Sequence, residues 1–158
     1  MSGPGGTAKV EVRHVEPQHT ASVRQTVDRD NIADDLGRMF QLVTTALARQ
    51  GVTPIGPPFA RYHEWGDEVD LEAGMPVATV IRPDGEVGPS SLPGGRAARA
   101  LHVGAYEDLR NTYESIEAWM AASGRSASGG PWEVYLTDPS TEPDPRRWAT
   151  EIIWPLRS

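Results

Sequence analysis

The sequence lacks cysteine altogether, and Lys9 is its single lysine among 158 residues. The absence of cysteine excludes a disulfide framework and thiolate chemistry, and it agrees with a reducing cytoplasm. No apolar run approaches the roughly 18 residues that a membrane-spanning helix needs, and the first ten residues contain no apolar segment typical of a signal peptide. We therefore expect a cytoplasmic protein that is neither secreted nor inserted into a membrane.

Basic residues are few. The chain has 15 Lys and Arg against 22 Asp and Glu, which gives a formal net charge of −7, and its arginines are scattered. Binding to phosphate groups depends on clustered Lys and Arg, so this balance argues against long-range attraction to nucleic acid or to an anionic membrane. The length fits one domain of ordinary size, or two small halves that share a core.

Motifs that mark common cofactor and metal chemistry are also missing. We find no P-loop, no dinucleotide fingerprint, no Gly-x-Ser-x-Gly elbow and no zinc motif. His63 and His102 have no second His, Cys or carboxylate at metal-ligand spacing, so we interpret both as structural histidines. The sequence therefore predicts neither a cofactor nor a metal.

Among the features that are present, a turn signal at residues 129–131 leads into a short run with strand preference. Strand alternation places Glu133 and Tyr135 on one face, and it places on the other face Trp132, Val134 and Leu136. Because a sheet buries its apolar side, we expect the Trp132 face to meet helices and the Glu133 face to line solvent or a cavity. In a cavity, a carboxylate beside aromatic rings attracts cations, through charge and through cation–π contacts of about 0.5–2 kcal/mol.

Hydrophobic periodicity predicts the other elements. Spacings of three and four residues predict an amphipathic helix from Ile32 to Leu47, closed by Gly51, and a second from Leu109 to Met120. Residues 1–9 are predicted to be a disordered leader. Strand-like runs cover residues 10–15, 21–27, 59–65, 69–77, 97–103, 132–136 and 149–156, whereas residues 82–95 are interpreted as a loop and residues 138–144 as a solvated acidic turn.

The two halves of the chain share one pattern. A constant shift of 73 residues places Gly51 on Gly124 and Tyr62 on Tyr135 without a gap, and six further residues in the second hairpin turn place Glu72 on Glu151. We infer a duplicated strand–helix–strand–strand unit, with pseudo-repeats at about residues 10–80 and 86–157. Each copy is too small to cover both faces of its sheet. We therefore predict one α+β domain, with an antiparallel sheet, helices on one side and a central ligand cleft.

The second half also resembles a known family. The residues that carry the resemblance are His102-x-Gly104-x-Tyr106-Glu107-x-Leu109, the run Gly130-Pro131-Trp132-Glu133-Val134-Tyr135-Leu136-x-Asp138-Pro139 and the closing Glu151-Ile152-x-Trp154-Pro155-Leu156. They are similar to the GyrI-like small-molecule-binding domain, which is also the effector-binding domain of many AraC- and MerR-type multidrug regulators. The resemblance extends from about Val10 to Leu156. No helix-turn-helix motif precedes this stretch, so we expect a stand-alone protein without direct DNA binding.

The resemblance implies a cleft for lipophilic, often cationic aromatic compounds, with a glutamate at its floor in the place of Glu133. Ala60 is the counterpart of Glu133 in the first half and leaves room above it. Glu72 and Glu151 are either a symmetric acidic pair in the cleft or ordinary exposed strand residues. The predicted ligand-binding residues are Glu133, Tyr135, Tyr62, Tyr106, Glu151, Ile153, Trp65 and Glu72.

Three functions follow from this pattern. We favour the capture of hydrophobic aromatic or cationic small molecules, with Glu133 as the electrostatic centre. Some stand-alone relatives are hydrolases that open the cyclopropane rings of alkylating natural products. By resemblance, Glu133 would transfer the proton, and Tyr135 or Tyr62 would orient the electrophile or a water. A third function is inhibition of a protein partner of the gyrase type. The sequence does not separate binder from hydrolase, because both need the same carboxylate.

Overall fold

The computed structural model describes residues 8–157, so the predicted leader falls almost entirely outside the described residues. The chain divides into two compact units. Unit 1 combines residues 8–15 with residues 95–157, and unit 2 is Glu16–Gly94. No helix within residues 8–157 is long and apolar enough to cross a membrane.

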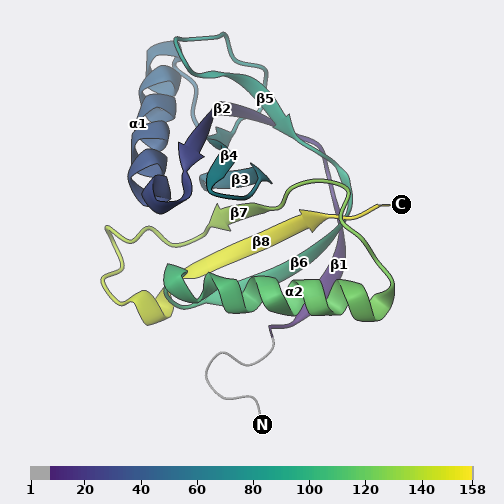
Figure 1. The fold of residues 1–158 in the computed structure, drawn as a ribbon. Coiled ribbons are helices and arrows are strands. Elements are labelled where there is room, and N and C mark those ends of the chain that lie inside the picture. The colour runs from purple at the N-terminus through teal and green to yellow at the C-terminus, as the bar shows by residue number, and fades with distance from the viewer. Residues whose placement is uncertain (1–7, 158) are drawn as a thin grey trace. The chain divides into compact units, whose positions relative to one another are not determined.

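Unit 2 is a four-stranded antiparallel sheet with one long helix (Figure 1). In chain order its elements are β2 (Gln18–Asp28), the 3-10 turn η1 (Arg29–Asn31), α1 (Ile32–Gln50), β3 (Phe59–Glu64), β4 (Glu68–Pro76) and β5 (Gly88–Leu92). The strands lie in the order β3-β4-β2-β5. Helix α1 ends where the sequence predicts, because Gly51 adopts a left-handed conformation with φ of 66°.

One face of the unit 2 sheet packs against α1. Val23 and Val27 on β2 are buried and point to the same side as Gln25, since strand residues alternate. The guanidinium of Arg38 on α1 donates a hydrogen bond to the Gln25 side chain. The helix therefore covers the Val23 face, and Glu72, which is paired with Arg24 between these positions, lies on the opposite face.

Unit 1 repeats this arrangement. In chain order its elements are β1 (Val10–Val15), β6 (Gly95–Val103), the 3-10 turn η2 (Tyr106–Asp108), α2 (Leu109–Ser123), β7 (Trp132–Tyr135), the 3-10 turn η3 (Pro145–Arg147) and β8 (Ala149–Pro155). The strands lie in the order β1-β6-β8-β7, and α2 runs along the sheet (Figure 1). The core under α2 consists of Ala98, Ala100, Leu109, Ile116, Met120, Ile152 and Leu156.

The strand registers of the two units match residue for residue. Phe59 pairs with Gly74 in unit 2, and Trp132 pairs with Ile153 in unit 1, as the shift of 73 and the six added turn residues require. Both helices also end at a left-handed glycine, Gly51 or Gly124. The α+β class and the duplicated strand–helix–strand–strand unit predicted from the sequence are confirmed.

The sequence analysis missed strand β5, because Gly88-Pro89-Ser90-Ser91 carries turn residues with little strand propensity. The segment becomes a strand by pairing with β2. The first strand of each half pairs within the other unit: β1, which precedes β2 in the chain, pairs with β6 in unit 1, and β5, which precedes β6, pairs with β2 in unit 2. Near this exchange Gly94 packs so closely on Pro17 that a Cβ at Gly94 would lie 2.5 Å from the proline ring.

Candidate functional site

Glu133 lies on the face of the unit 1 sheet that α2 covers. Its strand partner on β8 is Ile152, a member of the core under α2. Directly paired residues of adjacent strands point to the same side, so Glu133 and Tyr135 face the helix. The expected orientation, with the Trp132 face toward helices, is wrong. Glu133 and Trp132 are only 4% and 3% exposed, so both faces of β7 are buried and polarity does not reveal the helix side.

Two phenols hold the Glu133 carboxylate. The Tyr113 hydroxyl on α2 donates to Oε2 at 2.7 Å, and the Tyr135 hydroxyl on β7 donates to Oε1 at 2.8 Å. Each carboxylate oxygen thus accepts one short hydrogen bond. Bonds of this type are about twice as strong as those between neutral groups, and they fix the direction in which the carboxylate points.

Aromatic rings continue outward from these phenols. The Tyr106 ring lies edge-on to Tyr135, with centroids 5.8 Å apart, and stacks at a tilt on Trp148 at 4.8 Å. Tyr113 makes an edge contact with Trp154 at 5.8 Å. We call these five residues, Tyr106, Tyr113, Tyr135, Trp148 and Trp154, the aromatic cluster. It supplies ring faces and edges next to a buried carboxylate.

The electrostatic surroundings of Tyr106 are negative. Burial raises the pKa of its hydroxyl, and the charges of Asp138 and Glu133 raise this pKa further. The stacking partner Trp148 is held in place by its indole N–H, which donates to the carbonyl of Glu142 at 2.9 Å. A phenol with a raised pKa stays neutral over the physiological range.

Two buried threonines near this site differ in their hydrogen bonding. Thr150, the strand partner of Tyr135, is fully buried, and its hydroxyl has no hydrogen-bond partner within residues 8–157. The Thr112 hydroxyl instead lies 2.9 Å from Nδ1 of His102, whose Nε2 lies 2.8 Å from the Ala105 carbonyl. Because a carbonyl only accepts, Nε2 donates to it. His102 therefore has the satisfied structural role expected of it.

Glu151 and Ile153 lie on the other face of the unit 1 sheet. Glu151 pairs with Val134 rather than with Glu133, and its carboxylate accepts from Nε of Arg99 at 2.7 Å. Ile153 shares this side and is 8% exposed. The structure therefore brings Tyr106 and Tyr135 together with Glu133, but it does not bring Glu151 and Ile153 to the same face.

In unit 2, Glu72 is 4% exposed and accepts hydrogen bonds from the Ser22 hydroxyl at 2.6 Å and from Nε2 of His63 at 2.8 Å. Burial by itself raises the pKa of Glu72, but the hydrogen bonds from Ser22, Ser90 and His63 outweigh it and hold the pKa below its ordinary value. The strand register shifts between Tyr62 and Glu64, so a β-bulge places His63 at this contact.

The remaining predicted residues form a separate aromatic pair in unit 2. The rings of Tyr62 and Trp65 make an edge contact with centroids 5.5 Å apart, and Trp65 is 63% exposed. No cluster of three or more possible metal ligands occurs in the described part of the chain.

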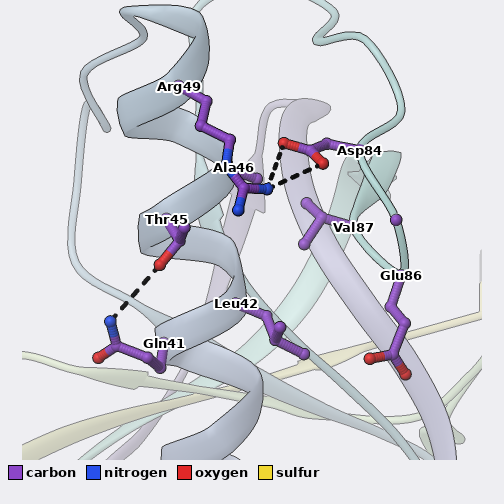
Figure 2. A pocket seen from close by; sticks show the side chains of 9 residues that line it. Gln41, Leu42, Thr45, Ala46, Arg49, Asp84, Glu86 and Val87 are labelled. Carbon is purple, nitrogen blue, oxygen red and sulfur yellow. Dashed lines mark hydrogen bonds and ion pairs between the residues drawn. The ribbon is translucent and has the colours of Figure 1, made fainter.

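Unit 2 also has an open groove of about 270 Å³ between α1 and residues 84–87. Figure 2 shows Arg49 reaching across it to Asp84, with Nη1 3.2 Å from both carboxylate oxygens. Leu42, Ala46 and Val87 supply its apolar lining. None of the predicted ligand-binding residues lines this groove.

A buried carboxylate held by phenols and flanked by aromatic rings, on a duplicated α+β fold, is typical of a domain that binds small organic molecules. The chain belongs to the GyrI-like small-molecule-binding domain family, whose profile matches residues 8–157. A sequence search of curated proteins finds no match.

Solved structures share the fold at low sequence identity. The C-terminal domain of EcmrR has a TM-score of 0.84 and 21% identity, with 96% of this chain and 98% of that one covered. In the EcmrR complex with DNA, the match spans 58% of the EcmrR chain. A hydrolase from Listeria innocua has a TM-score of 0.69 and 14% identity, with 96% of this chain and 93% of that one covered. SAV2435 bound to tetraphenylphosphonium has a TM-score of 0.64 and 11% identity, with 95% of this chain and 94% of that one covered.

The structure adds Tyr113 and Trp148, together with Trp154 behind Tyr113, to the predicted residues around Glu133. A signal for Tyr113 was present, because a tyrosine on the buried stripe of a helix needs a partner for its hydroxyl. Trp148 follows a long irregular segment, and nothing local in the sequence indicates that its ring returns to Tyr106. Both residues come from parts of the chain distant from Glu133.

Proposed function

We propose that this protein binds hydrophobic cations, with Glu133 as the counter-ion and the aromatic cluster as the surrounding wall. The observation that carries the proposal is the state of Glu133, which is 4% exposed and accepts a hydrogen bond from a phenol at each oxygen. Both of these donors are phenol hydroxyls, and together they fix the direction in which the carboxylate points.

A carboxylate in a buried site favours the binding of a cation. A carboxylate removed from water loses hydration, and a cation placed next to it restores favourable electrostatics in a medium of low dielectric constant. Rings beside the carboxylate add cation–π contacts of about 0.5–2 kcal/mol each and exclude water. SAV2435, which shares the fold, was solved with the aromatic cation tetraphenylphosphonium, and this supports the same ligand class here.

Replacement of Glu133 by Gln tests the proposal. Gln keeps the shape of the side chain but removes its charge, so methyltriphenylphosphonium should bind about 10- to 100-fold more weakly, whereas the neutral analogue triphenylphosphine oxide should lose little affinity. Isothermal titration calorimetry measures both ligands. Glu117→Gln, an exposed change on α2, is the control with the same loss of charge. Equal affinities of wild type and Glu133→Gln for the phosphonium ion would show that Glu133 is not a counter-ion.

A second candidate function is hydrolysis. The same geometry favours it, because Tyr113 and Tyr135 hold Glu133 where it could exchange a proton with a bound electrophile or a water. One protein of this fold is named a hydrolase. Incubation with a cyclopropane-bearing alkylating compound should then yield a ring-opened product that Glu133→Gln does not form. A product rate no higher than that without protein would exclude this activity.

A further inference from the structure

Tyr106 joins the Glu133 site to the acidic segment of residues 137–147. One side of its ring contacts Tyr135, whose hydroxyl donates to Glu133, and another contacts Trp148. The Trp148 indole is in turn hydrogen-bonded to the carbonyl of Glu142 within the acidic segment. A continuous series of rings therefore leads from a buried carboxylate to an exposed acidic loop.

The carboxylates of this loop differ in their partners. Asp144 accepts two hydrogen bonds from the Arg146 guanidinium, each at 3.1 Å, and Glu142 lies 3.8 Å from Nε of Arg147. Asp138 instead accepts from the backbone N–H and the hydroxyl of Ser140, at 2.9 and 2.7 Å. Within residues 8–157 it forms no ion pair. Asp138 is therefore the loop acid whose negative charge is not balanced by an arginine.

The charge of Asp138 acts on the aromatic cluster. The hydroxyl of Tyr106 has a pKa raised by burial first and then by Asp138 and Glu133, so both carboxylates lie close enough to influence the same ring. Hydrogen bonds from Ser140 lower the pKa of Asp138 and keep it ionised. The Asp138 carbonyl accepts from the backbone N–H of Glu142 at 3.0 Å, and the Glu142 carbonyl holds the Trp148 indole, so Asp138 belongs to the turn that supports the Trp148 ring.

We propose that this site prefers aromatic dications, with one positive charge at Glu133 and the second beside Tyr106 and Trp148, toward Asp138. The inference rests on the proposed function, since Glu133 must bind the inner charge. A flat ligand with a positive charge at each end can face both carboxylates that act on the Tyr106 hydroxyl. Flat rings between the charges stack on the same aromatic side chains that connect the carboxylates.

Two pyridinium compounds of nearly equal shape test this preference. N-methyl-4-phenylpyridinium carries one positive charge, and N,N′-dimethyl-4,4′-bipyridinium carries two. By calorimetry at low ionic strength we expect the dication to bind at least about threefold more tightly. Because Asp138 is exposed, this advantage should shrink at about 0.5 M salt, where charges are screened over a few ångströms.

Variants locate the second charge. Asp138→Asn should abolish the advantage of the dication and leave the affinity for the monocation unchanged, whereas Glu133→Gln should weaken both compounds. Asp144→Asn is the matched control, since it removes one charge from the same loop but from an acid already paired with Arg146. The advantage should persist in this control.

The outcomes distinguish a failure of the dication preference from a failure of the proposed function. If the wild type binds both pyridinium compounds equally, or if Asp138→Asn keeps the advantage, the dication preference is refuted, while loss of monocation binding in Glu133→Gln still supports the proposed function. If Glu133→Gln binds the monocation as well as the wild type does, the proposed function fails and the dication inference fails with it.

Discussion

Each unit of this protein buries one glutamate, but on opposite faces of equivalent sheets. In unit 1, Glu133 points to the helix-covered face and accepts hydrogen bonds from the phenols of Tyr113 and Tyr135. In unit 2, Glu72 points away from α1 and binds Ser22 and His63. Both residues are 4% exposed. Burial of a carboxylate therefore does not identify its role, whereas the chemistry of its partners does.

The duplication explains how this difference arises. The counterpart of Glu133 in unit 2 is Ala60, and the counterpart of Glu72 in unit 1 is Glu151. Ser22 and Arg99 also occupy equivalent positions, and each donates to the strand glutamate of its own unit. The backbone register is thus shared, and single side-chain differences place a buried charge beside a helix in one copy only.

The largest effect is expected when an acid replaces Ala60, the counterpart of Glu133 in unit 2. Ala60 is fully buried and pairs with Ala73 on the α1 face, so Ala60→Glu should cost about 4 kcal/mol of unfolding free energy. Tyr62 already matches Tyr135, and Phe40→Tyr would add the counterpart of Tyr113. The double variant Ala60→Glu/Phe40→Tyr should recover about 1 kcal/mol of the lost unfolding free energy. A double-mutant cycle measured by urea unfolding gives this coupling energy. A coupling energy of zero would show that position 60 cannot form the phenol-held arrangement.

Glu72→Gln measures how much the buried carboxylate of unit 2 contributes to stability. Loss of charge-assisted hydrogen bonds should cost about 2 kcal/mol at pH 7. The folded state lowers the pKa of Glu72, so its contribution is complete above the ordinary value of 4.5 and disappears as the pH falls through the lowered folded value. The difference from wild type in urea unfolding should therefore narrow below about pH 4. Glu68→Gln, at an exposed position on β4, should show no comparable pH dependence.

A smaller effect distinguishes the two buried threonines of unit 1. Thr150→Val removes a hydroxyl that has no partner within the described residues and should stabilise the protein by about 1 kcal/mol. Thr112→Val removes a hydroxyl bonded to His102 and should destabilise it by about 1–2 kcal/mol. Both are read from unfolding midpoints in urea. Effects of the same sign would mean that hydrogen bonding does not control these two positions.

Local patterns in the chain were enough to predict much of the fold. The helical stripes, the glycines that end the helices and the alignment of the two halves follow from short spacings along the chain, which are repeated in both halves. Alternation likewise places Glu133 and Tyr135 on one side of a strand. Strand β5 was not predicted. Its Gly, Pro and Ser residues have little strand propensity, and they form a strand because they pair with β2.

The duplication, the family pattern and the placement of an acid beside a phenol on β7 can be read from the sequence, because they depend on short and regular spacings. Only the tertiary structure decided which face of that strand α2 covers, since residues on both faces are buried. It also decided the partners of each carboxylate: the hydroxyl of Tyr113 reaches Glu133 across 20 residues, and that of Ser22 reaches Glu72 across 50. Such contacts arise from packing between elements, which no local spacing encodes.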